Sequence, residues 1–64
     1  MSIGQRVRQL RGQQRQDSFA PSLGVTQSQL SKIERGVLAP SIEVLLLLKD
    51  RFGKPIDWIL TGHE

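Results

Sequence analysis

The chain has 64 residues, no cysteine and one histidine, so it has room for one small domain that is held together without disulfides or thiolate metal sites. No apolar run approaches the ~20 residues that cross a bilayer, and no leader of basic and then apolar residues opens the chain. We therefore expect a single domain over residues 1–64 of a cytoplasmic protein, with no cofactor, no bound metal and no membrane partner.

The net charge of +3 is distributed unevenly along the chain. Residues 1–35 contain six basic and two acidic side chains, whereas residues 36–64 contain three basic and four acidic ones. A positive half of a small domain suits a polyanion, either a nucleic acid or a membrane surface. It is also compatible with a charged surface that binds nothing.

The first predicted helix covers residues 3–10, where apolar residues at i, i+4 and i+7 lie on one face. That apolar stripe consists of Ile3, Val7 and Leu10. Ser2 is a suitable N-cap because its hydroxyl can accept a hydrogen bond from an amide of the first turn. The polar run 12–16 is expected to form the connection that follows.

A second, short helix is expected over residues 17–23, capped by Asp17 or Ser18. Its inner face consists of Phe19, Ala20 and Leu23. Pro21 has no amide hydrogen and fits only the first turn of a helix, which it occupies if Ser18 is the cap. An earlier start would distort the helix at Pro21.

A third helix follows a glycine turn. Gly24 allows the positive φ that ends a helix, and Thr26 is then a good N-cap for a helix over about 26–34. Its apolar contacts and its terminator are expected to be Leu30, Ile33 and Gly36. Two short helices joined by a three- or four-residue turn that contains glycine are typical of a helix-turn-helix, here with a core over about 16–35.

Two further helices complete the predicted fold. Ser41 caps the fourth, over residues 42–52, and Pro55 begins the fifth, over residues 55–60, which is followed by a tail at 61–64. No segment alternates apolar and polar residues with a period of two, so only an all-α fold of five helices fits the pattern.

Five consecutive apolar residues, 44–48, cannot all face one small core. The stripe expected to face inward consists of Leu45, Leu48 and Phe52. Leu47 points away from that stripe. Beside Val44 or Trp58 it could form a dimer contact, and the alternative is incidental exposure.

The third helix carries the strongest candidate for a binding surface. Its exposed face would present polar side chains with no bulky apolar residue among them: Gln27, Ser28, Gln29 and Lys32. An α-helix fits the major groove of DNA, where glutamine pairs with adenine, lysine donates to guanine and serine does either. The alternative is an ordinary solvated helix face.

The most specific motif lies in residues 23–36, which read LGVTQSQLSKIERG and resemble the core of the phage-repressor and Cro-type helix-turn-helix family (lambda-repressor-like, XRE-type). Similarity extends to residues 3–11, 40–43 and 57–62. The resemblance implies a compact five-helix domain that acts as a two-fold dimer on operator DNA and regulates transcription.

The resemblance also implies roles for individual positions. The base-reading positions are Gln27, Ser28 and Lys32, with Gln29 near the groove edge. Gln16 would contact a phosphate and brace the recognition helix, while Arg11 and Glu34 would form a partly buried ion pair. Arg35 and the amide of Val37 match backbone-contacting positions, and Thr26 is also expected at the DNA backbone. From their charge, and not from the resemblance, Arg6, Arg8 and Arg15 could contact phosphates, and the alternative is solvated surface charge.

The chain departs from the family around the second helix. The connection before that helix is about two residues shorter than usual, and Arg15 stands where the family has a Ser or Thr cap. Together with Pro21, these departures leave the start of the second helix open.

We therefore expect a sequence-specific regulator of transcription that binds double-stranded DNA, acts as a homodimeric repressor on an inverted repeat, and is not an enzyme. No site for a small-molecule ligand is evident in the sequence. One alternative is an antitoxin or adaptor that uses the fourth helix to bind another protein. A second is a nucleoid-type protein that binds DNA without sequence preference.

Overall fold

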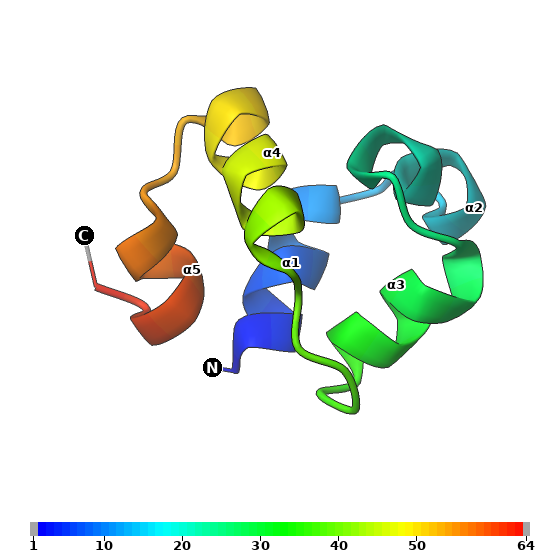
Figure 1. Cartoon of the computed structure of the whole chain (residues 1–64), viewed down its shortest axis with the longest axis horizontal. Coiled ribbons are helices and arrows are strands. Elements are labelled where there is room, and N and C mark those ends of the chain that lie inside the picture. The colour runs from blue at the N-terminus through cyan, green and yellow to red at the C-terminus, as the bar shows by residue number, and fades with distance from the viewer. Residues whose placement is uncertain (1, 64) are drawn as a thin grey trace.

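The computed structural model describes residues 2–63 and contains helices and connections but no strand within that range. Five α-helices and one 3₁₀ helix follow each other along the chain: α1 (Ile3–Arg11), α2 (Gln16–Phe19), η1 (Ala20–Leu23), α3 (Gln27–Glu34), α4 (Ile42–Phe52) and α5 (Ile56–Thr61) (Figure 1). The helices α2 and α3 lie at one end of the molecule and α5 at the other, with α1 and α4 between them (Figure 1). The predicted all-α fold of five helices is confirmed.

Local hydrogen bonds set the start of three helices. The hydroxyl of Ser2 accepts from the Gln5 amide at 3.1 Å, and the Gln5 side chain accepts from the Ser2 amide at 2.8 Å. The hydroxyl of Ser41 accepts from the Val44 amide at 3.2 Å, and Thr26 caps α3 in the same way as Ser2 caps α1. The three predicted caps are confirmed, because capping depends only on residues within one helical turn.

The second helix begins earlier than predicted. It starts at Gln16, and its N-cap is Arg15, which makes no side-chain capping bond, so neither Asp17 nor Ser18 caps it. At Ala20 the α-helix changes to the 3₁₀ helix η1. Pro21 explains this change, since it has no amide hydrogen with which to continue the α-helical ladder. The distortion expected for an early start is therefore present.

The core gathers buried side chains from every helix. Its members are Val7, Phe19, Ala20, Leu23, Leu30, Ile33, Val44, Leu45, Leu48 and Ile59. At the edge of this core, the predicted interior residues Ile3, Leu10 and Phe52 are partly buried. On α5, Ile56 is partly buried as well, whereas Leu60 is exposed.

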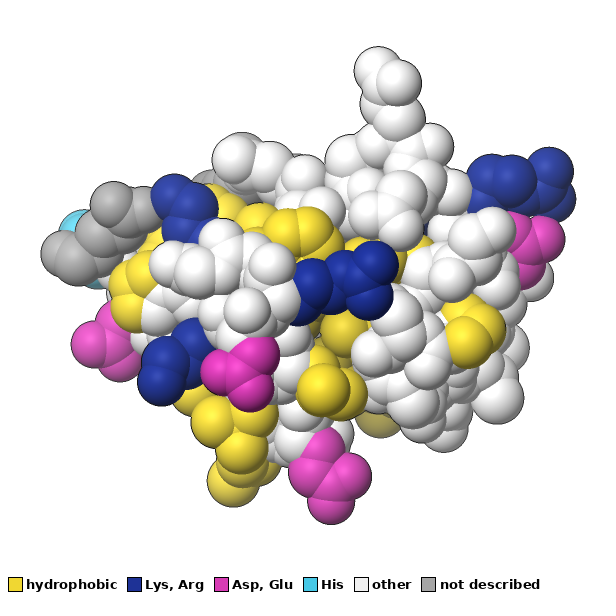
Figure 2. Space-filling view, turned by 90° about the horizontal axis from the view of Figure 1, so that it is seen from above, with side chains coloured by type: hydrophobic (Ala, Val, Ile, Leu, Met, Phe, Trp, Pro, Cys, Tyr) yellow, Lys and Arg dark blue, Asp and Glu magenta, His cyan; other side chains and the backbone are white. Residues whose placement is uncertain are grey.

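The apolar run on α4 divides between the core and the surface. Leu46 and Leu47 are exposed, and Figure 2 shows apolar side chains reaching the solvent beside acidic ones on one face of the molecule. Val44 is 3 % exposed and belongs to the core, because it lies one helical turn before the buried Leu48. Our assignment of Val44 to a dimer contact is therefore corrected.

The buried side chain of Arg6 on α1 donates hydrogen bonds to α5. Its Nε donates to the Ile59 carbonyl at 2.7 Å, and its Nη2 donates to the Leu60 carbonyl at 2.9 Å. The side chain is 5 % exposed. A guanidinium suits the end of a helix, where carbonyls lack amide partners and the dipole is negative. Arg6, expected at the DNA backbone, instead has a structural role.

The first turn of α1 packs directly on the last turn of α3. A Cβ added at Gly4 would lie 2.8 Å from the carbonyl carbon of Glu34 and still closer to the carbonyl oxygens of Ile33 and Glu34. Only glycine permits two helices to approach this closely at that position.

No helix within residues 2–63 is long and apolar enough to cross a membrane.

Candidate nucleic-acid interface

The outward face of α3 is polar along its whole length. Leu30 and Ile33 are buried against the core and determine which side of the helix faces inward. The opposite side exposes four hydrogen-bonding side chains: Gln27, Ser28, Gln29 and Lys32. The structure thus brings together all the residues that the sequence assigned to base readout.

Gln29 also caps the N-terminus of α3. The Thr26 hydroxyl accepts from the Gln29 amide at 3.1 Å, and the Thr26 amide donates to the side-chain oxygen of Gln29 at 2.9 Å. This reciprocal capping box satisfies two amides at the start of the helix. The Gln29 oxygen is therefore occupied, and the Thr-x-x-Gln spacing is the sequence signal for that role, which the assignment to base readout missed.

An ion pair joins the end of α1 to the end of α3. Arg11 donates from Nε to Oε2 of Glu34 at 2.7 Å and from Nη2 to Oε1 at 3.0 Å. The pair that the family resemblance implied is thus present, and the two side chains are only 14 % and 5 % exposed. The hydrogen bonds to Glu34 raise the pKa of Arg11 above its ordinary value, so the guanidinium stays charged.

Gln16 connects α2 to the same carboxylate. Its Nε2 donates to Oε1 of Glu34 at 3.0 Å, and its Oε1 accepts from Nε2 of Gln27 at 3.5 Å. Gln16 therefore contacts both ends of α3, as expected for a residue that braces the recognition helix. Its contact with a phosphate stays a prediction.

The basic side chains near α3 differ in their surroundings. Arg8 and Lys32 are exposed, and Arg35 is exposed at the end of α3. Arg15 pairs with Asp17 at 3.0 Å on the surface, and their hydrogen bonds raise the pKa of Arg15 and lower that of Asp17. All four cations are exposed to solvent, and Arg15 shares its charge with Asp17.

The segment after α3 uses its backbone amides within the fold. The amides of Val37 and Leu38 both donate to the Lys32 carbonyl, at 2.9 and 3.2 Å, and Gly36 has the positive φ of 79° that this reversal requires. The Val37 amide was expected to contact the DNA backbone. It closes α3 instead, so we remove it from the candidate contacts.

Comparison with known proteins identifies this arrangement. A model of the helix-turn-helix family matches residues 7–59, which span α1 to α5. The chain belongs to this helix-turn-helix family.

A solved structure of the P22 c2 repressor protein in complex with a synthetic operator is similar to this helix-turn-helix protein, with a TM-score of 0.86 and 29 % sequence identity over 98 % of each chain. The resemblance to phage repressors in residues 23–36 is thereby confirmed. A comparison with the curated proteins finds no significant match.

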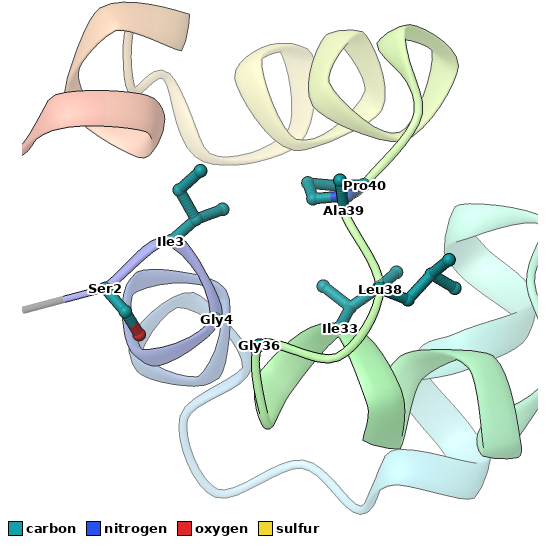
Figure 3. Close-up of a pocket in the computed structure, with 8 residues that line it drawn as sticks. All are labelled: Ser2, Ile3, Gly4, Ile33, Gly36, Leu38, Ala39 and Pro40. Atoms are coloured by element: carbon teal, nitrogen blue, oxygen red, sulfur yellow. The ribbon is translucent and has the colours of Figure 1, made fainter.

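The helix-turn-helix protein also contains a hollow that the sequence did not indicate. It has a volume of about 260 Å³ and lies between the first turn of α1 and the connection from α3 to α4 (Figure 3). Apolar side chains of Ile3, Ile33, Leu38 and Pro40 form most of its described lining. The Ser2 hydroxyl accepts from the Gln5 amide, and the described lining contains no charged side chain to orient a ligand.

Proposed function

We propose that this protein is a sequence-specific regulator of transcription that binds double-stranded DNA through α3 and acts in the cytoplasm as a repressor. The observation that carries the proposal is the polar outer face of α3. This helix follows a glycine turn, and the buried side chains of Leu30 and Ile33 anchor its inner face in the core. Similarity to the P22 c2 repressor, whose structure contains a synthetic operator, supports DNA as the partner. Residues 1–64 would form one DNA-binding domain.

Base readout is assigned to the first two turns of α3. Gln27 has the paired donor and acceptor that adenine requires, Lys32 has donors for the acceptors of guanine, and Ser28 can serve either base. Residues near the start of the recognition helix are those that reach base edges in this docking geometry. Gln29 contributes its side-chain NH₂ group, since its oxygen caps α3.

Phosphate contacts supply affinity and fix the register of α3 in the groove without reading the sequence. The proposed contacts are the exposed cations Arg8, Arg15 and Arg35, with Gln16 and Thr26 at the starts of α2 and α3. Arg6 and the Val37 amide take no part, because both are used within the fold.

We further propose that two copies bind as a homodimer to an inverted repeat. Leu47 on α4 is 42 % exposed, and Trp58 on α5 is half-buried, so both offer apolar surface to a second copy. A two-fold dimer places the two copies of α3 about 34–36 Å apart, in successive major grooves. Val44 is excluded from this contact by its burial.

A protein-interaction role is the second candidate. Ile42 and Leu46 lie one turn apart on α4, and both are exposed. An apolar stripe of this kind suits an antitoxin or adaptor that uses α4 to bind another protein. If this candidate function is correct, α3 need not prefer any base sequence.

The test is selection of bound sequences from a random pool of double-stranded DNA at about 0.15 M salt, where attraction to the backbone alone is weak. We expect an inverted repeat whose half-sites lie about one helical turn apart. A single half-site would keep the DNA-reading function and remove the dimer. No enrichment of any sequence would contradict the proposed function and favour a protein partner for α4.

A further inference from the structure

Four side chains form a continuous hydrogen-bonded chain from the interior to the base-reading surface. It begins with Arg11 and Glu34, continues through Gln16 and ends at Gln27. The distances along it are 2.7 and 3.0 Å for the ion pair, 3.0 Å from Gln16 to Glu34, and 3.5 Å from Gln27 to Gln16. This hydrogen-bonded chain therefore connects the buried carboxylate of Glu34 with the exposed amide of Gln27.

The carboxylate gives this chain a direction. Glu34 is paired with a guanidinium, and a carboxylate can only accept hydrogen bonds. Gln16 must therefore turn its NH₂ group toward Glu34, which leaves its oxygen facing Gln27. That oxygen in turn accepts from the NH₂ group of Gln27, so one acceptor-only group determines the orientation of two amides in succession.

The orientation of the Gln27 amide matters for base readout. Adenine presents an acceptor, N7, beside a donor, N6, so a glutamine must present its donor and acceptor in the matching order. A flipped amide presents them in the reverse order. The contact between Gln27 and Gln16 is long, so it biases the amide of Gln27 without clamping it.

Resting on the proposed function, we infer that Glu34 is a positioning residue for base specificity: through Gln16 it selects which way the Gln27 amide faces and hence which base Gln27 prefers. Arg11 holds the Glu34 carboxylate in place with two hydrogen bonds. Because the Glu34 side chain is 5 % exposed, water does not readily replace either partner of the carboxylate. The Glu34 carboxylate therefore serves the fold through Arg11 and the readout through Gln16.

The decisive variant is Glu34→Gln, which keeps the shape of the side chain but supplies both a donor and an acceptor. Gln16 can then face either way, and so can Gln27. The base pair read by Gln27 is first located with Gln27→Ala, using single-base variants of the selected operator. We expect Glu34→Gln to reduce the preference at that base pair by about five-fold or more, with the preference at the base pair read by Lys32 unchanged.

Arg11→Lys is the matched control. It removes the two-pronged pair and lowers stability but leaves the Glu34 carboxylate to accept from Gln16, so the preference at the Gln27 base pair should persist. Gln16→Met removes the middle link of this hydrogen-bonded chain and should reproduce the loss of base preference expected for Glu34→Gln. It decides the question if Glu34→Gln does not fold.

Three outcomes would overturn the inference. Full preference at the Gln27 base pair in both Glu34→Gln and Gln16→Met would show that the amide needs no such bias. Equal losses at the Gln27 and Lys32 base pairs would indicate general disorder of α3. A wild-type protein without any base preference would remove the proposed function itself, and the inference with it.

Discussion

At the scale of the residue, the structure separates polar groups that are used within the fold from those that remain available. Arg6 and the Val37 amide satisfy helix-terminal carbonyls, and the oxygen of Gln29 caps α3. Ser28 and Lys32 are exposed on the outward face of α3. This division, rather than residue type, decides which side chains can contact DNA.

Arg6→Met tests the structural role of the buried guanidinium. Two carbonyls at the end of α5 lose a charged donor, and an unsatisfied buried acceptor costs about 1–3 kcal/mol, so the free energy of unfolding should fall by that order. Chemical denaturation measures this loss. The salt dependence of DNA binding should not change. A salt slope reduced by about one unit, with stability intact, would instead return Arg6 to the DNA backbone.

Lys32→Ala and Arg8→Ala separate base readout from backbone contact. Loss of a base contact should relax the preference at one base position by about 1–3 kcal/mol. Loss of a phosphate contact should weaken binding to all sequences alike and reduce the salt slope by about one unit. Binding titrations on matched operators at several salt concentrations distinguish the two. Equal losses on every sequence for both variants would mean that α3 is wrongly assigned.

At the scale of the element, the position of α3 depends on close packing against α1. Gly4 allows the first turn of α1 to approach the last turn of α3, and Arg11 pairs with Glu34 at the other end of α1. Glu34 thus lies between two contacts with the same helix. The C-terminal turn of α3 is therefore fixed against both ends of α1.

Gly4→Ala tests this packing. Alanine gains about 1 kcal/mol of helix propensity, but its Cβ must displace backbone carbonyls of Ile33 and Glu34, and overpacking of this kind costs about 1–3 kcal/mol. Because the obstructing atoms belong to the backbone, the cost should dominate and the midpoint of chemical denaturation should fall. Gln9→Ala, at an exposed position of α1, should change stability by no more than about 0.5 kcal/mol. An unchanged midpoint in Gly4→Ala would show that the helices separate freely.

At the scale of the whole molecule, a domain of 64 residues can gain both affinity and stability from a second copy. The apolar run on α4 leaves exposed apolar surface that a second copy could cover. Val44 and Leu48 fill the core, whereas Leu46 and Leu47 remain exposed. The helix α4 therefore carries more apolar residues than the core of one copy can cover.

Leu47→Glu tests the proposed dimer contact. A charge at the interface should shift the sedimentation coefficient to that of a monomer and weaken binding to an inverted repeat, with binding to a single half-site retained. Ile42→Glu, also at an exposed apolar position of α4, is the matched control and should leave the dimer intact. Loss of the dimer in the control alone would move the interface to the start of α4.

The sequence by itself determined α1, α3, α4 and α5, three helix caps and the polar face of α3, but not the start of α2. These features depend on residues within one or two turns: the spacing of Leu30 and Ile33 defines the inward face, and Thr26 reaches only as far as Gln29. The family motif added the pairing of Arg11 with Glu34, which spacing alone does not imply.

Only the tertiary structure decided the roles of Arg6 and Val44 and the direction of the hydrogen-bonded chain from Glu34 to Gln27. Arg6 meets carbonyls more than fifty residues away, and Gln16 finds an acceptor on a helix that begins eleven residues later. Whether a polar group is used or available depends on the atoms that packing brings within about 3 Å of it. Local periodicity carries no information about those neighbours, because they come from other elements.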